Sequence, residues 1–192
     1  MFVISCHADT GFDVHRCSRM DSIFTGTMDN YSGVYAVLRA FFSGRITQNY
    51  VRIELTYGEE NDCEGAYEVL ETLRDQDVVI VVDVTGTPTQ RDFVIEKCRC
   101  TSMHSWLIEA LSDHSFDIYT GCPDPVSDSD EVDVYSEKLQ RVCFLGVPRR
   151  GGDYNEHETS VSEGSINAIS NALCDLIECF PEYCTREGIS LS

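Results

Sequence analysis

The sequence predicts an α/β protein with three layers, in which helices cover both faces of a mostly parallel, mixed sheet. Strand patterns alternate along the chain with helical patterns, as they do in βαβ units. The run 78–82 is apolar on both faces, which is typical of a central parallel strand. The 192 residues are 42% hydrophobic, enough for one ordinary core. Because no repeat or linker divides the chain, we expect residues 1–192 to form a single catalytic domain.

Hydrophobic periodicity gives the expected elements in chain order. Apolar runs and apolar–polar alternation predict strands at 2–6, 51–55, 78–82, 91–97, 116–119 and 142–147. Apolar residues at helical spacing predict helices at 34–41, 66–74, 103–113 and 166–177. We expect residues 10–27 to be an irregular connection and residues 123–133 to be an acidic loop. Ser160 and Glu163 have the spacing of a capping box before the last helix.

Charge and cysteine usage limit the partners and the compartment. With 33 acidic residues against 14 basic ones, the net charge is −19, which argues against nucleic acid and anionic membranes as partners and suits cation binding. The sequence has no apolar run that could span a bilayer and no signal-peptide pattern at its start. Its ten cysteines include no C-x-x-C pair. We therefore expect reduced thiols and a cytoplasmic location.

Histidine and carboxylate side chains follow the ends of three predicted strands. They are His7 and Asp9, the pair Glu59 and Glu60, and Asp83. Because ligands bind beyond the carboxyl ends of parallel strands, we expect these side chains to share one rim. Adjacent carboxylates repel each other, and a metal ion is the usual source of the compensating charge. The alternatives are a solvated acidic turn and a chance H-x-D in a polar loop.

Two more candidates lie in loops that lead into helices on the same rim. Asp29 precedes the helix at 34–41, where the alternative is an ordinary N-cap. His157 precedes the last helix. Two histidines with several carboxylates suit Zn²⁺, with Mn²⁺, Co²⁺ and Fe²⁺ as alternatives. His15 and His104 are expected to be surface residues.

Five segments, taken in order, carry a resemblance to a known family. They are I-S-C-H-A-D at 4–9, T-M-D-N-Y-S-G at 27–33, T-Y-G-E-E-N at 56–61, V-V-D-V-T-G at 81–86 and E-H-E-T at 156–159. This set resembles the two-zinc exopeptidases, which include bacterial leucyl aminopeptidases, the larger tetrahedral aminopeptidases, and related carboxypeptidases and amidohydrolases. The resemblance spans residues 2 to about 180, and its order and spacing make it specific.

The resemblance implies a role for each candidate residue. Two metal ions would be held by five residues, with His7 and Asp83 on one ion, Glu60 and His157 on the other, and Asp29 bridging them. Asp9 would support the imidazole, as carboxylates do beside metal-binding histidines. Glu59 would be the general base. The resemblance also implies a cis peptide bond between Asp29 and Asn30.

The function implied by the resemblance is that of an aminopeptidase acting on short peptides. In this interpretation the acidic loop with Asp128, Asp130 and Glu131 attracts the substrate ammonium group. A second interpretation is a carboxypeptidase or N-acyl amino acid deacylase in which Arg149 or Arg150 grips a carboxylate. A third, from another class, is a metal-binding or interaction module that does not catalyse. The presence of a candidate base argues against the third.

The sequence differs from the family pattern at its front. The H-x-D strand lies near the start of the sequence, where family members carry a substantial segment, and there is no inserted lid domain. We therefore expect the strand at 2–6 to lack a covering segment, and a second copy of the chain to cover it in a homo-oligomer.

Overall fold

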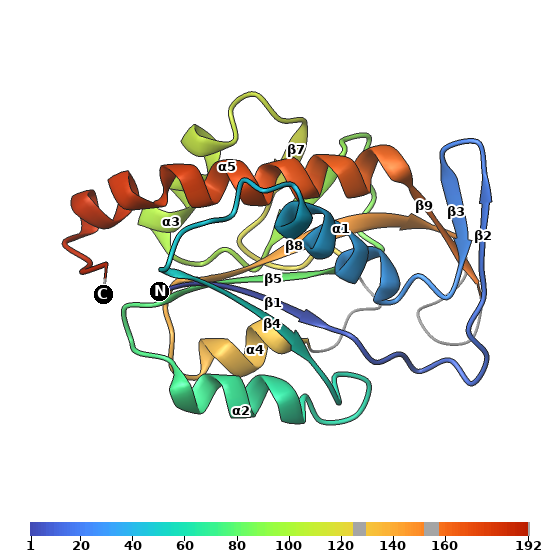
Figure 1. Cartoon of the computed structure of the whole chain (residues 1–192), viewed down its shortest axis with the longest axis horizontal. Helices are drawn as coiled ribbons and strands as arrows, with labels where there is room; N and C mark the ends of the chain where they lie inside the picture. Colours follow the sequence, from blue (N-terminus) through green and yellow to red (C-terminus); the bar gives the residue numbers. More distant parts are fainter. Residues whose placement is uncertain (125–129, 152–157, 192) are drawn as a thin grey trace.

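The computed structural model describes residues 1–124, 130–151 and 158–191. Within these residues the chain forms one mixed sheet with helices on both faces, so the predicted α/β class is confirmed (Figure 1). No helix of the described ranges is long and apolar enough to cross a membrane.

Four parallel strands form the centre of the sheet. Their spatial order is β4 (Val51–Thr56), β1 (Phe2–His7), β5 (Val78–Thr85) and β8 (Val142–Arg150). The remaining described strands extend the sheet beyond β8, mainly through antiparallel pairs. They are β9 (Thr159–Ser162), β3 (Ile23–Gly26) and β2 (Cys17–Met20) along one path, and β6 (Phe93–Glu96) with β7 (Phe116–Ile118) along the other.

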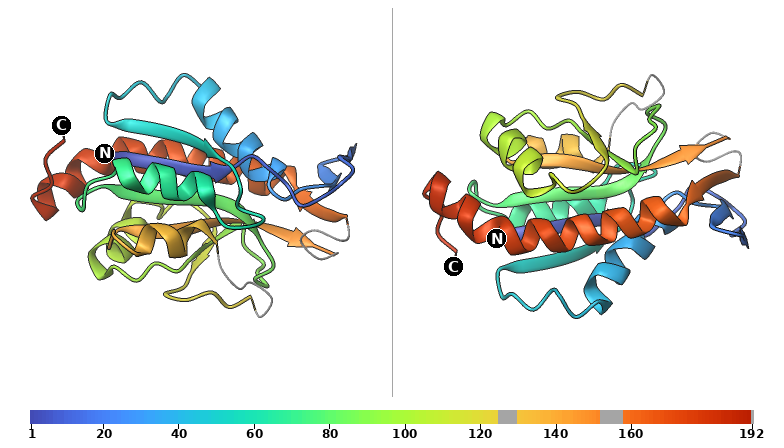
Figure 2. Two further views of the ribbon diagram at one scale, coloured as in Figure 1. Left: turned by 90° about the horizontal axis from the view of Figure 1, so that it is seen from below. Right: turned by 90° about the horizontal axis from the view of Figure 1, so that it is seen from above.

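The helices divide between the two faces of the sheet. One face carries α1 (Tyr31–Phe42), α3 (Thr101–Ala110) and α5 (Glu163–Glu187), and the other carries α2 (Glu64–Thr72) and α4 (Glu131–Ser136) (Figures 1 and 2). Alternate side chains of β1 serve both cores. Ile4 packs in the cluster under α1 and α5, whereas Val3 packs in the cluster under α2 and α4.

The strand register places the candidate residues at one edge of the sheet. His7 ends β1 and pairs with Thr56, the last residue of β4. On the other side of β1, Ser5 pairs with Val81 of β5, two residues before Asp83. Because these strands run parallel, their carboxyl ends open onto the same rim, as the sequence predicted.

Three local expectations were wrong. Residues 10–27 contain the hairpin of β2 and β3, whose side chains are mostly exposed and so show no apolar pattern. Residues 123–133 contain the start of α4, which begins at Glu131 and is capped by Asp130. The N-cap of α5 is Ser162 instead of Ser160, because β9 occupies the residues before it.

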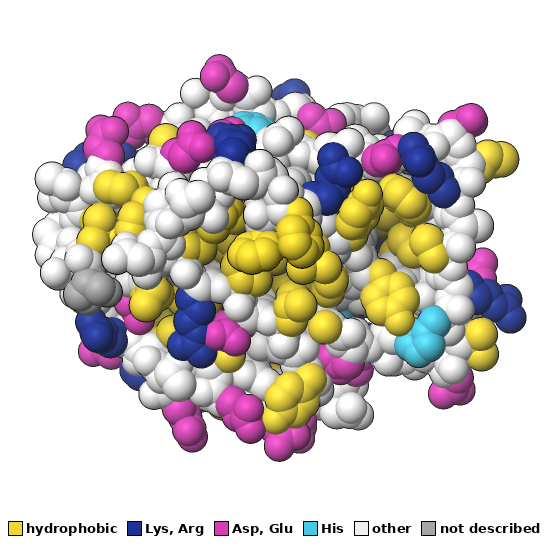
Figure 3. Space-filling model, viewed as in Figure 1, with side chains coloured by type: hydrophobic (Ala, Val, Ile, Leu, Met, Phe, Trp, Pro, Cys, Tyr) yellow, Lys and Arg dark blue, Asp and Glu magenta, His cyan; other side chains and the backbone are white. Residues whose placement is uncertain are grey.

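The expectation that the first strand lacks cover was also wrong. Every residue of β1 is buried, since β4 and β5 pair with it on both sides. The open edge of the central strands belongs to β4, which is half-exposed. Apolar side chains gather over α1 and β4 on the face seen in Figure 3, and the exposed ones include Phe41, Phe42 and Leu55.

Candidate metal centre

His7 is the centre of the cluster at the rim. Its side chain is 1% exposed, and its Nε2 lies 3.2 Å from Asp29 Oδ1 and 3.2 Å from Asp83 Oδ2. Nδ1, on the other side of the ring, lies 3.4 Å from Asp9 Oδ1. Three ligand atoms, one each from His7, Asp29 and Asp83, lie within 4.8 Å of one another. The ring therefore has carboxylates at both nitrogens, with two of them sharing Nε2.

Asp29 reaches this cluster because its neighbour caps the helix. The N-cap of α1 is Asn30, whose Oδ1 accepts a hydrogen bond from the Gly33 amide at 3.0 Å. The Asn30 Nδ2 group donates to the Val82 carbonyl at 2.8 Å, which ties the cap to β5. The peptide bond between Asp29 and Asn30 is cis, as the resemblance implied. The N-cap alternative for Asp29 is thus excluded, and its carboxylate faces the rim.

Gly33 of the D-N-x-x-G segment leaves room for this cap. A Cβ at this position would lie 2.2 Å from Asn30 Oδ1. We predict that Gly33→Ala lowers the free energy of unfolding by about 1–3 kcal/mol, the usual cost of overpacking. Urea denaturation measures this change. Gly44→Ala is the control. A Cβ added at this position would meet no atom within 4 Å, but Gly44 has a positive φ of 78°, so the loss of stability would come from backbone strain alone. A Gly33→Ala variant as stable as the wild type would contradict the role of the cap.

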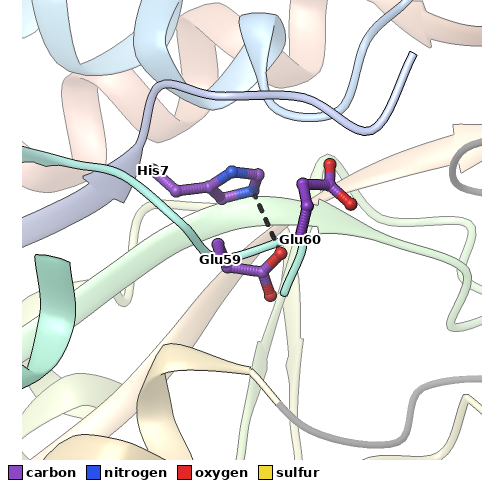
Figure 4. Close-up of side chains that lie close together, drawn as sticks. All are labelled: His7, Glu59 and Glu60. Carbon is purple, nitrogen blue, oxygen red and sulfur yellow. Dashed lines mark ion pairs between the residues drawn. The ribbon is translucent and has the colours of Figure 1, made fainter. Parts of the chain in front are cut away.

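The Glu59–Glu60 turn approaches His7 from the end of β4 (Figure 4). Gly58 has a φ of 75°, and its carbonyl accepts hydrogen bonds from the amides of residues 61, 62 and 63, which closes the turn. Glu59 Oε2 lies 4.0 Å from His7 Nε2. A second set of ligand atoms, one each from His7, Glu59 and Glu60, also lies within 4.8 Å. The imidazole is thus shared by two overlapping groups.

The carboxylates of the cluster lie close together and are largely removed from water, which raises the free energy of their ionised forms. Burial, followed by the charge of Asp83, raises the pKa of Glu59 to about 9. Burial raises the pKa of Asp83 to about 7, although His7 opposes this. Burial would lower the pKa of His7, but Asp83 and hydrogen bonds with its acidic neighbours raise it well above its ordinary value. Burial and neighbouring negative charge thus both disfavour the ionised carboxylates of this cluster.

A divalent cation fits this donor set. Asp29 Oδ1 and Asp83 Oδ2 both lie 3.2 Å from His7 Nε2, and the single N–H at that nitrogen cannot compensate both carboxylates. A bound cation would neutralise the carboxylates that the imidazole leaves uncompensated. Imidazole nitrogen with carboxylate oxygens is a donor set for Zn²⁺ and for the neighbouring first-row ions. Asp9 would fix the ring orientation from Nδ1, and the hydrogen bond from His7 lowers the pKa of that carboxyl.

The remaining predicted residues fall into two groups. His157 and Asp128 fall outside the described residues. Asp130 and Glu131 do not form an acidic patch for a substrate ammonium group, because both are buried. Asp130 pairs with Lys97 at 2.9 Å, and Glu131 accepts hydrogen bonds from Ser5 and Thr56. The sequence alone missed this buried carboxylate behind the cluster, since its pattern is that of a solvated loop.

The fold resembles that of solved aminopeptidases. Aminopeptidase APDkam598 from the archaeon Desulfurococcus kamchatkensis matches with a TM-score of 0.70 at 15% identity, over 90% of this chain and 54% of that one. Yeast aminopeptidase 1 matches with a TM-score of 0.69 at 10% identity, over 92% and 51%. The chain has the fold of these aminopeptidases.

A third solved structure that matches is PhTET1-12s, a dodecamer in the asymmetric unit. Its TM-score is 0.70 at 12% identity, over 85% of this chain and 53% of that one. The chain thus spans about half the length of each of these structures. No family model and no curated protein matches the sequence.

Proposed function

We propose that the chain is a metal-dependent hydrolase with a two-metal centre, and that it acts as an aminopeptidase on short peptides. The observation that carries this proposal is the convergence of His7, Asp29, Asp83 and the Glu59–Glu60 turn on one cluster at the sheet rim. The aminopeptidase fold supports it. The single sheet that joins β1 to β9 supports treating residues 1–192 as one catalytic domain.

The proposed roles follow the resemblance, and the ligand set is His7 with Asp83, Glu60 with His157, and Asp29 between the two pairs. Two bound zinc ions, or Mn²⁺, Co²⁺ or Fe²⁺ in their place, would supply Lewis-acid chemistry at the scissile carbonyl. Asp9 holds the His7 ring through Nδ1. Glu59 accepts the proton of the attacking water at its carboxylate and delivers it to the leaving amine.

The second candidate, a carboxypeptidase or N-acyl amino acid deacylase, is favoured by a pocket beside the rim. The pocket has a volume of about 550 Å³, and Gly86, three residues beyond Asp83, is one of its lining residues. Arg91, Arg149 and Arg150 contribute to its lining, and none of its described lining residues is acidic. In a chain with net charge −19, such a pocket suits a substrate carboxylate. A non-catalytic metal-binding module is the remaining alternative.

Metal analysis and a substrate panel test these functions together. We expect the purified chain to bind zinc, to hydrolyse aminoacyl-anilides, and to lose that activity to a chelator and regain it with Zn²⁺. Dipeptides blocked at the amino end should resist cleavage, and those blocked at the carboxyl end should be cleaved. The reverse preference would establish the carboxypeptidase or deacylase interpretation. Metal binding without hydrolysis of any substrate would leave the non-catalytic module, and no metal binding would refute the centre.

We also propose that the chain forms a homo-oligomer, with no nucleic acid or membrane among its partners. The open edge of β4 and the exposed apolar side chains of α1 support self-association. So does the dodecamer described for PhTET1-12s. Light scattering at high protein concentration tests the proposal, and a monodisperse monomer would contradict it.

A further inference from the structure

A buried carboxylate lies behind the candidate metal centre without belonging to it. Glu131, the first residue of α4, is 1% exposed. Its Oε2 accepts a hydrogen bond from Ser5 Oγ at 2.8 Å, and its Oε1 accepts one from Thr56 Oγ1. Ser5 Oγ is also 2.9 Å from Tyr135 OH, one turn along α4. Both oxygens of this carboxylate are therefore held by hydroxyl groups of the central strands.

The two hydroxyl donors sit on the segments that carry the candidate ligands. Ser5 lies two residues before His7, on the same face of β1. Thr56 pairs with His7 across the strands, and its carbonyl accepts the amide of Ala8 at 2.9 Å. The turn that presents Glu59 begins directly after Thr56. A shift of either hydroxyl would move the end of its strand, and with it a side chain of the centre.

The carboxylate is itself held firmly in place. Asp130 caps α4 by accepting from the Val132 amide at 2.8 Å, and it pairs with Lys97 at 2.9 Å. Lys97 also pairs with Asp133 at 2.6 Å, so one buried cation holds the start of this helix from two sides. Burial raises the pKa of Glu131, which reflects the cost of placing an acid there. A non-polar residue would fill this position at lower cost if packing were its purpose.

We propose that Glu131 is a positioning residue, which fixes the ends of β1 and β4 through its hydrogen bonds to Ser5 and Thr56 and so sets the geometry of the metal centre. This inference rests on the proposed function. Glu131 acts through the strand ends rather than through contact with a metal or substrate. Groups that hydrogen-bond directly to metal ligands typically change metal affinity or activity by about 10-fold to 100-fold, and we expect a loss within this range from Glu131, which acts through the backbone that carries the ligands.

The test is the affinity of the purified chain for Zn²⁺, measured by competition with a chromophoric chelator. Glu131→Met keeps the approximate volume but removes both acceptors, and Thr56→Val removes one donor. We expect each to weaken Zn²⁺ binding by about 10-fold to 100-fold. Glu131→Gln and Thr56→Ser keep the hydrogen bonds, since hydroxyls can donate or accept, and should stay within about threefold of the wild type. The Glu131→Met/Thr56→Val double variant should be no weaker than Glu131→Met alone.

A destabilised control separates positioning from simple stability. Val134→Ala creates a cavity in the same helix but keeps the side chains of Glu131, Ser5 and Thr56, and should lower the melting temperature while leaving Zn²⁺ affinity unchanged. Wild-type affinity in folded Glu131→Met would overturn the inference. So would an equal loss in Glu131→Gln, because the effect would then come from charge. A wild-type chain that binds no Zn²⁺ would instead refute the proposed function, and this inference with it.

Discussion

Glu59→Gln is expected to lower the turnover number by about 10²-fold to 10⁴-fold, the usual contribution of a positioned acid–base group. The amide keeps the shape and can still form a hydrogen bond, but it cannot accept a proton. Glu59 Oε2 is 4.0 Å from His7 Nε2, farther than the carboxylates of Asp29 and Asp83. Metal content should therefore stay near that of the wild type. The metal-free variant should be at least as stable as the wild type at pH 7, because the amide removes an ionisation that burial disfavours.

Glu60→Gln is the matched variant, with the same chemical change one residue away. In the proposed assignment it removes an anion from the ligand set, so metal occupancy should fall. Metal content and rate, measured on both variants, decide between the roles. If Glu59→Gln lost metal while Glu60→Gln kept it, the two assignments would be exchanged. If both kept metal and activity, the pair would be a solvated acidic turn.

The metal-free chain is expected to lose stability as pH rises from about 4 to about 9, by on the order of a few kcal/mol. The pKa of Asp83 rises from 3.8 to about 7 on folding, and that of Glu59 from 4.5 to about 9. In this window the folded state binds more protons than the unfolded state, so deprotonation favours unfolding. The raised pKa of His7 acts in the same direction, because its contribution is lost as pH rises.

Urea denaturation with a chelator at pH 5, 7 and 8.5 measures this loss. Added Zn²⁺ should remove most of it, because the cation compensates the carboxylates that repel each other in its absence. Asp83→Asn is the control, since an amide at this position cannot ionise and the loss should become smaller. A metal-free stability that stayed constant or rose between pH 5 and 8.5 would contradict the charge deficit inferred for the cluster.

The sequence predicted the central layer well because parallel strands have a strong signature. Val78–Val82 is apolar on both faces, and polar residues that follow such strands must share a rim. This reasoning alone brought His7, Glu59 and Asp83 to one edge. The short strands β2, β3 and β9 were not predicted, because four residues each, with few apolar side chains among them, give no recognisable hydrophobic period in the sequence.

The carboxylate of Glu131 could not be predicted from local pattern. An acid in an acidic, proline-bearing segment is normally solvated, and its burial depends on contacts 75 and 126 residues away. The same limit applied to Asp29. A helix start preceded by Asp-Asn offers two capping residues, and only the fold shows that Asn30 takes the cap and leaves its neighbour facing the rim.

The pairing of β1 between β4 and β5 makes the centre sensitive to insertions and deletions in an uneven way. Side chains alternate along β1, so one residue added or removed between Ile4 and His7 would turn the imidazole to the face of α1, where Cys6 now contacts Asn30. The irregular connections between ligand-bearing strands do not have to change length by an even number of residues. Residues 10–16 and 43–50, which form no helix or strand, can therefore change length during evolution or engineering, while the spacing inside β1 cannot change by an odd number.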